Sequence, residues 1–300
     1  MLLKLERDRL QTKADALQKS IKDVDLCYLK IEEKISKESM LDDGGEKFGE
    51  ENMRKEDFNE KEKKEKPQIT NKAKLSQFPP EDRPNPFTRM TIEPLNYKGA
   101  VLAKTYKGHL MEISRVAFHP RKSIIATVSD DFTWKIWTLP NGELIMSGEG
   151  HKDWVSGVSF HPKGTHLATS SGDCTVKVWD FITASCKYTF KDHIQPIWSV
   201  AFNDTGDFLV TGSIDHSCRL LDMGAGRSRN SFRGHVDSVN HVTFQPFTNN
   251  FASCSADKTI SLWDIRSGLC VQTFYGHLNS VNKVDFSARG DLITSCDSDG

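Results

Sequence analysis

Features that would mark a membrane protein or a secreted protein are missing from this sequence of 300 residues. No apolar run approaches the roughly 20 residues of a bilayer-spanning helix, and charged residues interrupt the N-terminus too often for a secretory signal. Seven cysteines are scattered without a CxxC pair, which favours reduced thiols over a disulfide framework. The net charge of −1 gives no overall attraction to nucleic acid or membranes. The sequence therefore predicts a soluble protein of the cytoplasm.

Catalytic motifs are equally scarce. The sequence has no glycine-rich phosphate loop, no GxSxG nucleophile turn and no HExxH metal site. Its basic residues are not interleaved with aromatic residues as they are in nucleic-acid-binding segments. We therefore predict a protein without catalytic residues, metal or cofactor, whose partners are other proteins.

The first forty residues carry a heptad pattern. One set of positions recurs every seven residues, and a second set follows each member by four, as positions d and a do in a coiled coil. The first set is Leu3, Leu10, Leu17, Val24 and Ile31, and the second is Arg7, Ala14, Ile21, Tyr28 and Ile35. We predict a coiled-coil helix over 1–40 that joins the chain to a partner or a second copy. The alternative is a single amphipathic helix lying on another part of the same protein.

Residues 41–97 have the composition of a linker. Interleaved Glu and Lys dominate 46–66, which leaves too little apolar surface to offset the entropy of ordering the segment. Prolines then interrupt the chain at 67, 79, 80, 84, 86 and 94, so that neither a helix nor a central strand can form there. We predict a charged, proline-containing disordered linker over 41–97.

From residue 98 to the end the sequence repeats with a period of 42 residues. Three positions recur at this spacing: His109, His151, His193, His235 and His277; Phe118, Phe160, Phe202, Phe244 and Phe286; and Asp131, Asp173, Asp215, Asp257 and Asp299. Within each unit, short alternating runs are separated by turn signals such as Pro162-Lys-Gly164. Four antiparallel strands in about 42 residues make one blade of a β-propeller. The predicted fold class is therefore an all-β propeller over 98–300.

The repeated strings resemble the WD-repeat family. Gly150-His151 and Gly234-His235 precede the first strand of their units, and Trp179-Asp180 and Trp263-Asp264 end the third. The resemblance implies a hydrogen-bonded tetrad of His, Ser or Thr, Asp and Trp in each blade, with a structural role. By position these tetrads are His109, Thr127, Asp131 and Trp137; His151, Thr169, Asp173 and Trp179; and His235, Ser253, Asp257 and Trp263.

The third unit departs from this pattern. Leu221 stands where the other complete units have Trp, so no indole N–H can donate to Thr211, and Asp192 replaces the Gly before His193. The loss of one hydrogen bond costs about 0.5–1.5 kcal/mol. We predict that this blade is the least stable of the four complete ones.

The fifth unit ends at Gly300, before its third strand. A typical seven-bladed ring needs about 300 residues by itself, and an unclosed propeller exposes strand edges. The sequence thus predicts four complete units and part of a fifth, belonging to a larger ring whose remaining blades lie downstream.

Two tryptophans interrupt the repeat at the start of the innermost strands. Trp154 lies three residues after its His and Trp198 five after its own, where the other units have small or polar residues or Pro. Tryptophan is enriched at the centres of protein interfaces. We predict that Trp154 and Trp198 bind a partner, and the alternative is that they pack against neighbouring blades.

Longer strings extend the resemblance to one group within the family. Gly150-His-Lys-Asp-Trp154 and Gly234-His-Val-Asp-Ser-Val-Asn240, together with the upstream heptads, are similar to the sperm-associated-antigen WD-repeat family of the ciliary central apparatus. This resemblance implies an axonemal, microtubule-associated scaffold that supports cilium or flagellum assembly and motility. The alternatives are another cytoskeletal scaffold, similar to the katanin regulatory subunit or a dynein regulator, and a ubiquitin-ligase substrate adaptor.

Overall fold

The structure is a computed structural model that describes residues 75–81, 83–89, 99 and 101–300. The coiled coil predicted over 1–40 lies outside these residues, as does most of the predicted linker. Within the described ranges there is no α-helix, and every regular element is a β-strand.

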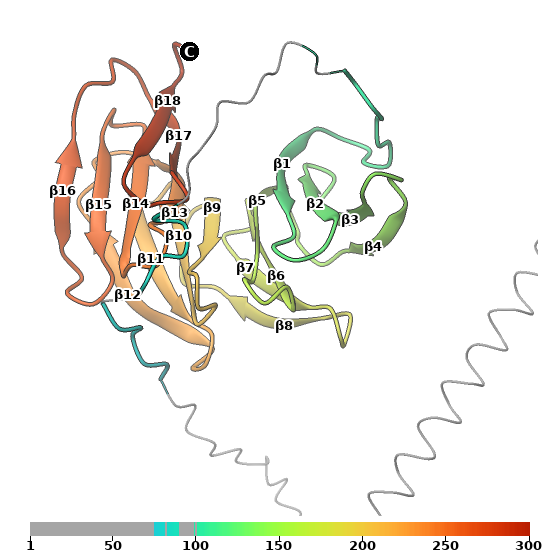
Figure 1. Ribbon diagram of the computed structural model, residues 1–300, viewed down its shortest axis with the longest axis horizontal. Helices are drawn as coiled ribbons and strands as arrows, with labels where there is room; N and C mark the ends of the chain where they lie inside the picture. Colours follow the sequence, from blue (N-terminus) through green and yellow to red (C-terminus); the bar gives the residue numbers. More distant parts are fainter. Residues whose placement is uncertain (1–74, 82, 90–98, 100) are drawn as a thin grey trace, which may run out of the picture. The chain divides into compact units, whose positions relative to one another are not determined.

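Four sheets of four antiparallel strands succeed one another along the chain, and a strand pair comes after them (Figure 1). The first blade is β1 (Ile113–Phe118), β2 (Ile124–Ser129), β3 (Trp134–Thr138) and β4 (Leu144–Gly148); the second is β5 (Val155–Phe160), β6 (His166–Ser171), β7 (Val176–Asp180) and β8 (Ser185–Phe190); the third is β9 (Ile197–Phe202), β10 (Phe208–Ser213), β11 (Ser217–Asp222) and β12 (Arg227–Arg233); the fourth is β13 (Val239–Phe244), β14 (Asn250–Ser255), β15 (Ile260–Asp264) and β16 (Cys270–Phe274); the pair is β17 (Val281–Phe286) and β18 (Ile293–Asp297).

The first strand of each blade is the innermost. β1, β5, β9, β13 and β17 contact one another in that order, as the inner strands of adjacent propeller blades do. The fold is therefore the predicted propeller.

Each blade has two ends. The tetrad end carries the loop before the inner strand and the turn between the second and third strands, and the far end carries the other two turns.

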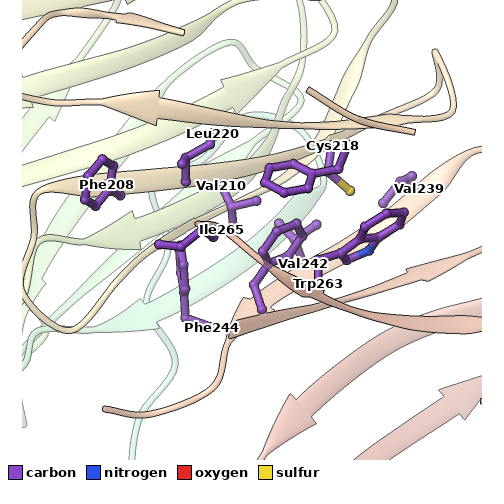
Figure 2. Packing of buried hydrophobic residues seen from close by; sticks show 11 residues of the cluster. Phe208, Val210, Cys218, Leu220, Val239, Val242, Phe244, Trp263 and Ile265 are labelled. Carbon is purple, nitrogen blue, oxygen red and sulfur yellow. The ribbon is translucent and has the colours of Figure 1, made fainter. Parts of the chain in front are cut away.

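The hydrophobic core lies between blades, because each sheet is covered by its neighbour. Figure 2 shows the cluster in which Phe208 and Leu220 of the third blade face Val242, Phe244 and Trp263 of the fourth. Phe208 and Leu220 are fully buried. Burying such side chains stabilises the fold by about 1.5–3 kcal/mol each.

One stretch of the predicted linker lies within the described residues. Residues 75–81 and 83–89, which we call the strap, lie against the far ends of the third and fourth blades and of the β17–β18 pair. The Phe78 ring stacks on Phe208 with 5.3 Å between the centroids, and the Asn85 amide donates to the carbonyls of Ala288 and Arg289 at 3.1 and 2.9 Å. These contacts hold the strap against the blades, although its own sequence offers no periodic apolar surface.

Candidate interaction surface

The structure brings the four members of the first predicted tetrad together at the tetrad end. His109 Nδ1 lies 2.9 Å from Asp131 Oδ2, and His109 Nε2 lies 2.7 Å from Thr127 Oγ1. Trp137 Nε1 donates to Thr127 Oγ1 at 2.8 Å. Each donor has an acceptor if the imidazole is neutral: the indole donates to the hydroxyl, the hydroxyl to Nε2, and Nδ1–H to the carboxylate. The network therefore joins the loop before β1 to β2, β3 and the turn between them.

The second and fourth tetrads repeat this geometry. His151 is 3.0 Å from Asp173 and 2.8 Å from Thr169, to which Trp179 donates at 2.9 Å. In the fourth blade, His235 is 2.8 Å from Asp257 and 2.7 Å from Ser253, to which Trp263 donates at 2.8 Å.

The aspartates of the tetrads are held in their charged form. Burial by itself would raise the pKa of Asp173, but hydrogen bonds from His151, Thr175 and the Lys152 amide outweigh it and place the pKa well below its ordinary value. The same balance lowers the pKa of Asp131 and Asp257. The network recurs in blade after blade, whereas an active site needs a single constellation of residues.

The third blade keeps three of the four members. His193 lies 2.7 Å from both Asp215 and Thr211, but Leu221 is buried in the place of the indole. The Thr211 hydroxyl thus lacks the donor that its counterparts have.

In the strand pair β17–β18 the histidine takes a different partner. His277 Nδ1 lies 2.8 Å from Asp297, whereas Asp299, the residue in the 42-residue register, accepts from the Asn279 amide at 2.6 Å. Periodicity alone therefore names the wrong carboxylate for His277.

Candidates for other chemistry are few in the described part of the chain. It contains no group of three or more His, Cys, Asp or Glu side chains placed to hold a metal ion. Burial raises the pKa of the Cys254 thiol to about 12 and raises that of Cys218 further, so these thiols stay protonated. No helix of the described residues is long and apolar enough to cross a membrane.

Trp154 and Trp198 meet at the tetrad end. Their rings stack with 4.7 Å between the centroids and an interplanar angle of 28°. They border a cavity of about 390 Å³ whose other lining residues are Ser114, Arg115, Ser156, Asn240, Ser280 and Asn282. Trp198 is 37 % exposed. The pair therefore bridges the second and third blades and also presents aromatic surface to a polar cavity.

The sequence carries a signal for this arrangement that periodicity did not reveal. Gly172 lies in the turn after β6, and a Cβ atom there would lie 2.5 Å from the Trp154 ring. The equivalent positions of the other blades are Asp130, Ile214 and Ala256. The glycine is therefore explained by the close approach of the indole.

Arg115 is a second residue of this surface that sequence reasoning missed. It projects from β1, and its guanidinium reaches the Ser199 hydroxyl of β9 at 3.4 Å. Burial lowers its pKa. The next two blades have Gly157 and Ser199 at this position, whereas the fourth blade has His241 and the last strand pair has Lys283. Because basic residues recur at this position, periodicity alone did not single out Arg115.

Comparison with known proteins agrees with this architecture. The family model described as "WD domain, G-beta repeat" (WD40) matches residues 100–138, 142–180, 184–222, 226–264 and 268–300. The chain is 52 % identical over 67 residues to the flagellar WD repeat-containing protein Pf20 of Chlamydomonas reinhardtii, which covers 22 % of this chain and 11 % of that protein. It is 36 % identical over 167 residues to sperm-associated antigen 16 protein of Mus musculus, covering 49 % of this chain and 26 % of that protein. The human sperm-associated antigen 16 protein is 35 % identical over 159 residues, with 49 % and 24 % covered. The matches thus span about a quarter or less of each relative's length.

Proposed function

The chain belongs to the WD40 family of WD-domain, G-beta repeats, and from this premise we propose that it is a non-catalytic scaffold for protein–protein interaction in cilia or flagella. Proteins of this family generally act as interaction scaffolds, and the relatives that match are flagellar and sperm-associated by name. The finer proposal is a component of the axonemal central apparatus that supports assembly and beating, with residues 1–40 joining a microtubule-associated partner or a second copy.

The observation that carries the proposal is the stacked pair Trp154 and Trp198 beside a polar cavity. A large aromatic side chain that is partly exposed, rigidly supported and surrounded by polar groups has the character of an interface hot spot. Trp198 meets each condition: Trp154 supports its ring, and the neighbouring cavity wall is formed by Ser, Asn and Arg side chains. We propose that this surface of the tetrad end binds an axonemal protein.

The test is the location and retention of the tagged chain in ciliated cells. We expect signal along the axoneme that resists extraction in high salt. The variant Trp198→Ala should lose this retention by about tenfold or more, which corresponds to a hot spot worth at least about 1.4 kcal/mol. Tyr275→Ala is the matched control, because Tyr275 is an exposed aromatic residue outside the pair.

Two outcomes would contradict the proposal. A diffuse cytosolic signal, or a signal at ubiquitin-ligase complexes, would refute the ciliary assignment while leaving the propeller unaffected. Equal retention of Trp198→Ala and Tyr275→Ala, at equal thermal stability, would refute the role of the tryptophan pair.

A further inference from the structure

The strap shows how the groove between two blades takes up an extended segment. Phe78 enters between the third and fourth blades, where its ring stacks on Phe208 and carries the Arg229 guanidinium 3.7 Å from its centroid. The next residue, Pro79, is buried, and its carbonyl accepts from the buried Asn249 amide at 2.8 Å. Arg83 then pairs with Asp204 and donates to the Thr248 carbonyl at 2.6 Å. An aromatic residue, a proline and a charged residue thus occupy this groove in order.

The groove between the first and second blades is the counterpart, two repeats earlier in the sequence, of the groove that the strap fills. Positions two blades apart differ by twice the repeat of 42 residues, so Ile124 corresponds to Phe208, and Thr165 corresponds to Asn249. A cavity of about 480 Å³ lies here at the far end. Its apolar lining comprises Ile124, Ile136, Ile145, Met146, Phe181 and Ile182.

Two of the apolar side chains that border this cavity are exposed to solvent. Ile145 and Ile182 are 52 % and 86 % exposed. They correspond to Arg229 and Arg266 of the groove that the strap fills. Burial of these two exposed isoleucines is favourable, so the first groove favours apolar contact more than its counterpart does.

The charges of the two grooves are opposite where the strap has Arg83. Asp204 is replaced by Pro120, and the cavity wall contains Arg121, Lys122 and Lys163. The carbonyl that accepts from Arg83 corresponds to that of Gly164, which already accepts from His119 Nε2 at 3.2 Å. An arginine at this place would find no carboxylate and would lie among cations, whereas an acidic residue would be attracted.

We propose that the groove between the first and second blades binds an extended segment of a partner protein, in which a bulky apolar residue and a proline are followed by acidic residues. The apolar residue fills the cavity beside Ile145 and Ile182, and the acidic residues pair with the basic wall. This site is at the opposite end of the blades from Trp154 and Trp198, and the proposal holds whether or not the ciliary assignment is correct.

A synthetic peptide tests this directly. The probe is the strap sequence of residues 75–83 carrying Arg83→Glu, labelled at its N-terminus and titrated against the full chain by fluorescence anisotropy. We expect saturable binding that is about tenfold tighter than that of the peptide with the native arginine. Added salt should weaken it, since the charges involved are near the surface.

Variants of the chain locate the binding. Ile182→Glu should weaken the peptide about tenfold or more by placing a like charge and removing apolar surface. Ile194→Glu is the control, because Ile194 is similarly exposed, at 81 %, but lies in the loop before β9 at the tetrad end. Neither substitution changes a buried side chain, so both chains should melt at the same temperature.

Three outcomes would overturn the proposal. They are absence of saturable binding, equal affinity of the Ile182→Glu and Ile194→Glu chains, and equal affinity for the two peptides. A photo-reactive residue at position 145 gives an independent measure. Cross-links to the peptide would support a partner segment, whereas cross-links to residues 1–74 of the same chain would assign the groove to the chain itself.

Discussion

The second and third blades share one architecture but are stabilised by different means. In the second blade, Trp179 donates to Thr169 and completes a network of four side chains. The third blade has Leu221 at that position, and there the strap covers Asp222, which accepts from the Ser76 hydroxyl at 2.6 Å and from its amide at 2.9 Å. Asp222 is fully buried, whereas its counterpart Asp180 is partly exposed. The difference indicates that contacts with a segment outside the repeat can offset a hydrogen bond that is missing within the repeat.

The largest change in stability is expected from a substitution that makes the second blade resemble the third. Trp179→Leu removes the indole donor and leaves space in the core between the first and second blades, where Trp179 packs against Trp134 with 5.3 Å between centroids. No described residue of the strap covers this blade. We expect a loss of about 3 kcal/mol in the free energy of unfolding, from the cavity and the hydrogen bond together.

Urea denaturation followed by tryptophan fluorescence and circular dichroism would measure this loss. Lys177→Ala in the same strand is the control and should change stability by less than about 0.5 kcal/mol, since Lys177 is outside the core. A loss for Trp179→Leu below about 1 kcal/mol would mean that the indole contributes little, and that the third blade needs no offset.

Removing the aromatic contact of the strap tests whether the strap stabilises the third blade. Phe78→Ala should cost about 2 kcal/mol, because the ring is half-buried between Phe208 and the Arg229 guanidinium. Phe87→Ala is the matched control: Phe87 is exposed and lies 6.2 Å, centroid to centroid, from Phe247. If both variants lose equally little in thermal unfolding, the strap does not stabilise the third blade.

A smaller difference between the two blades concerns how their stability depends on pH. The second blade has His161 where the third has Asn203. Burial, followed by the charges of His166 and Lys163, lowers the pKa of His161 to about 4. The ordinary pKa is about 6.5, so the unfolded chain takes up the proton first as pH falls. The stability that the neutral imidazole contributes is therefore complete above about pH 6.5 and is lost as pH falls toward 4.

His161→Asn copies the third blade and should remove part of this acid sensitivity. We expect the loss of stability between about pH 7 and pH 4.5 to shrink by about 1 kcal/mol. Unfolding curves at the two pH values, for the parent chain and the variant, measure this. An unchanged difference would show that His161 titrates normally.

The sequence predicts the blades well because their signals are local and repeated. His151, Thr169, Asp173 and Trp179 fall on neighbouring strands and turns, so their spacing implies their meeting. The strap could not be predicted in this way: its order comes from Asp222, Phe208 and Asn249, more than a hundred residues away. Likewise, alternation along one strand says nothing about the stacking of Trp154 on Trp198, which depends on how adjacent blades are set.

Hydrogen exchange would compare the local stability of the second and third blades strand by strand. Without the indole donor, the amides of β10 and β11 should open at a free energy up to about 1 kcal/mol below those of β6 and β7, because one hydrogen bond is missing and the strap offsets only part of it. Phe78→Ala should widen this gap, since it removes the offset while leaving β6 and β7 untouched. Equal protection of the two blades in the parent chain would contradict the prediction that the third is the least stable. Equal protection that persists in Phe78→Ala would further show that Leu221, buried among Phe190, Val200 and Leu209, replaces the tryptophan fully through packing.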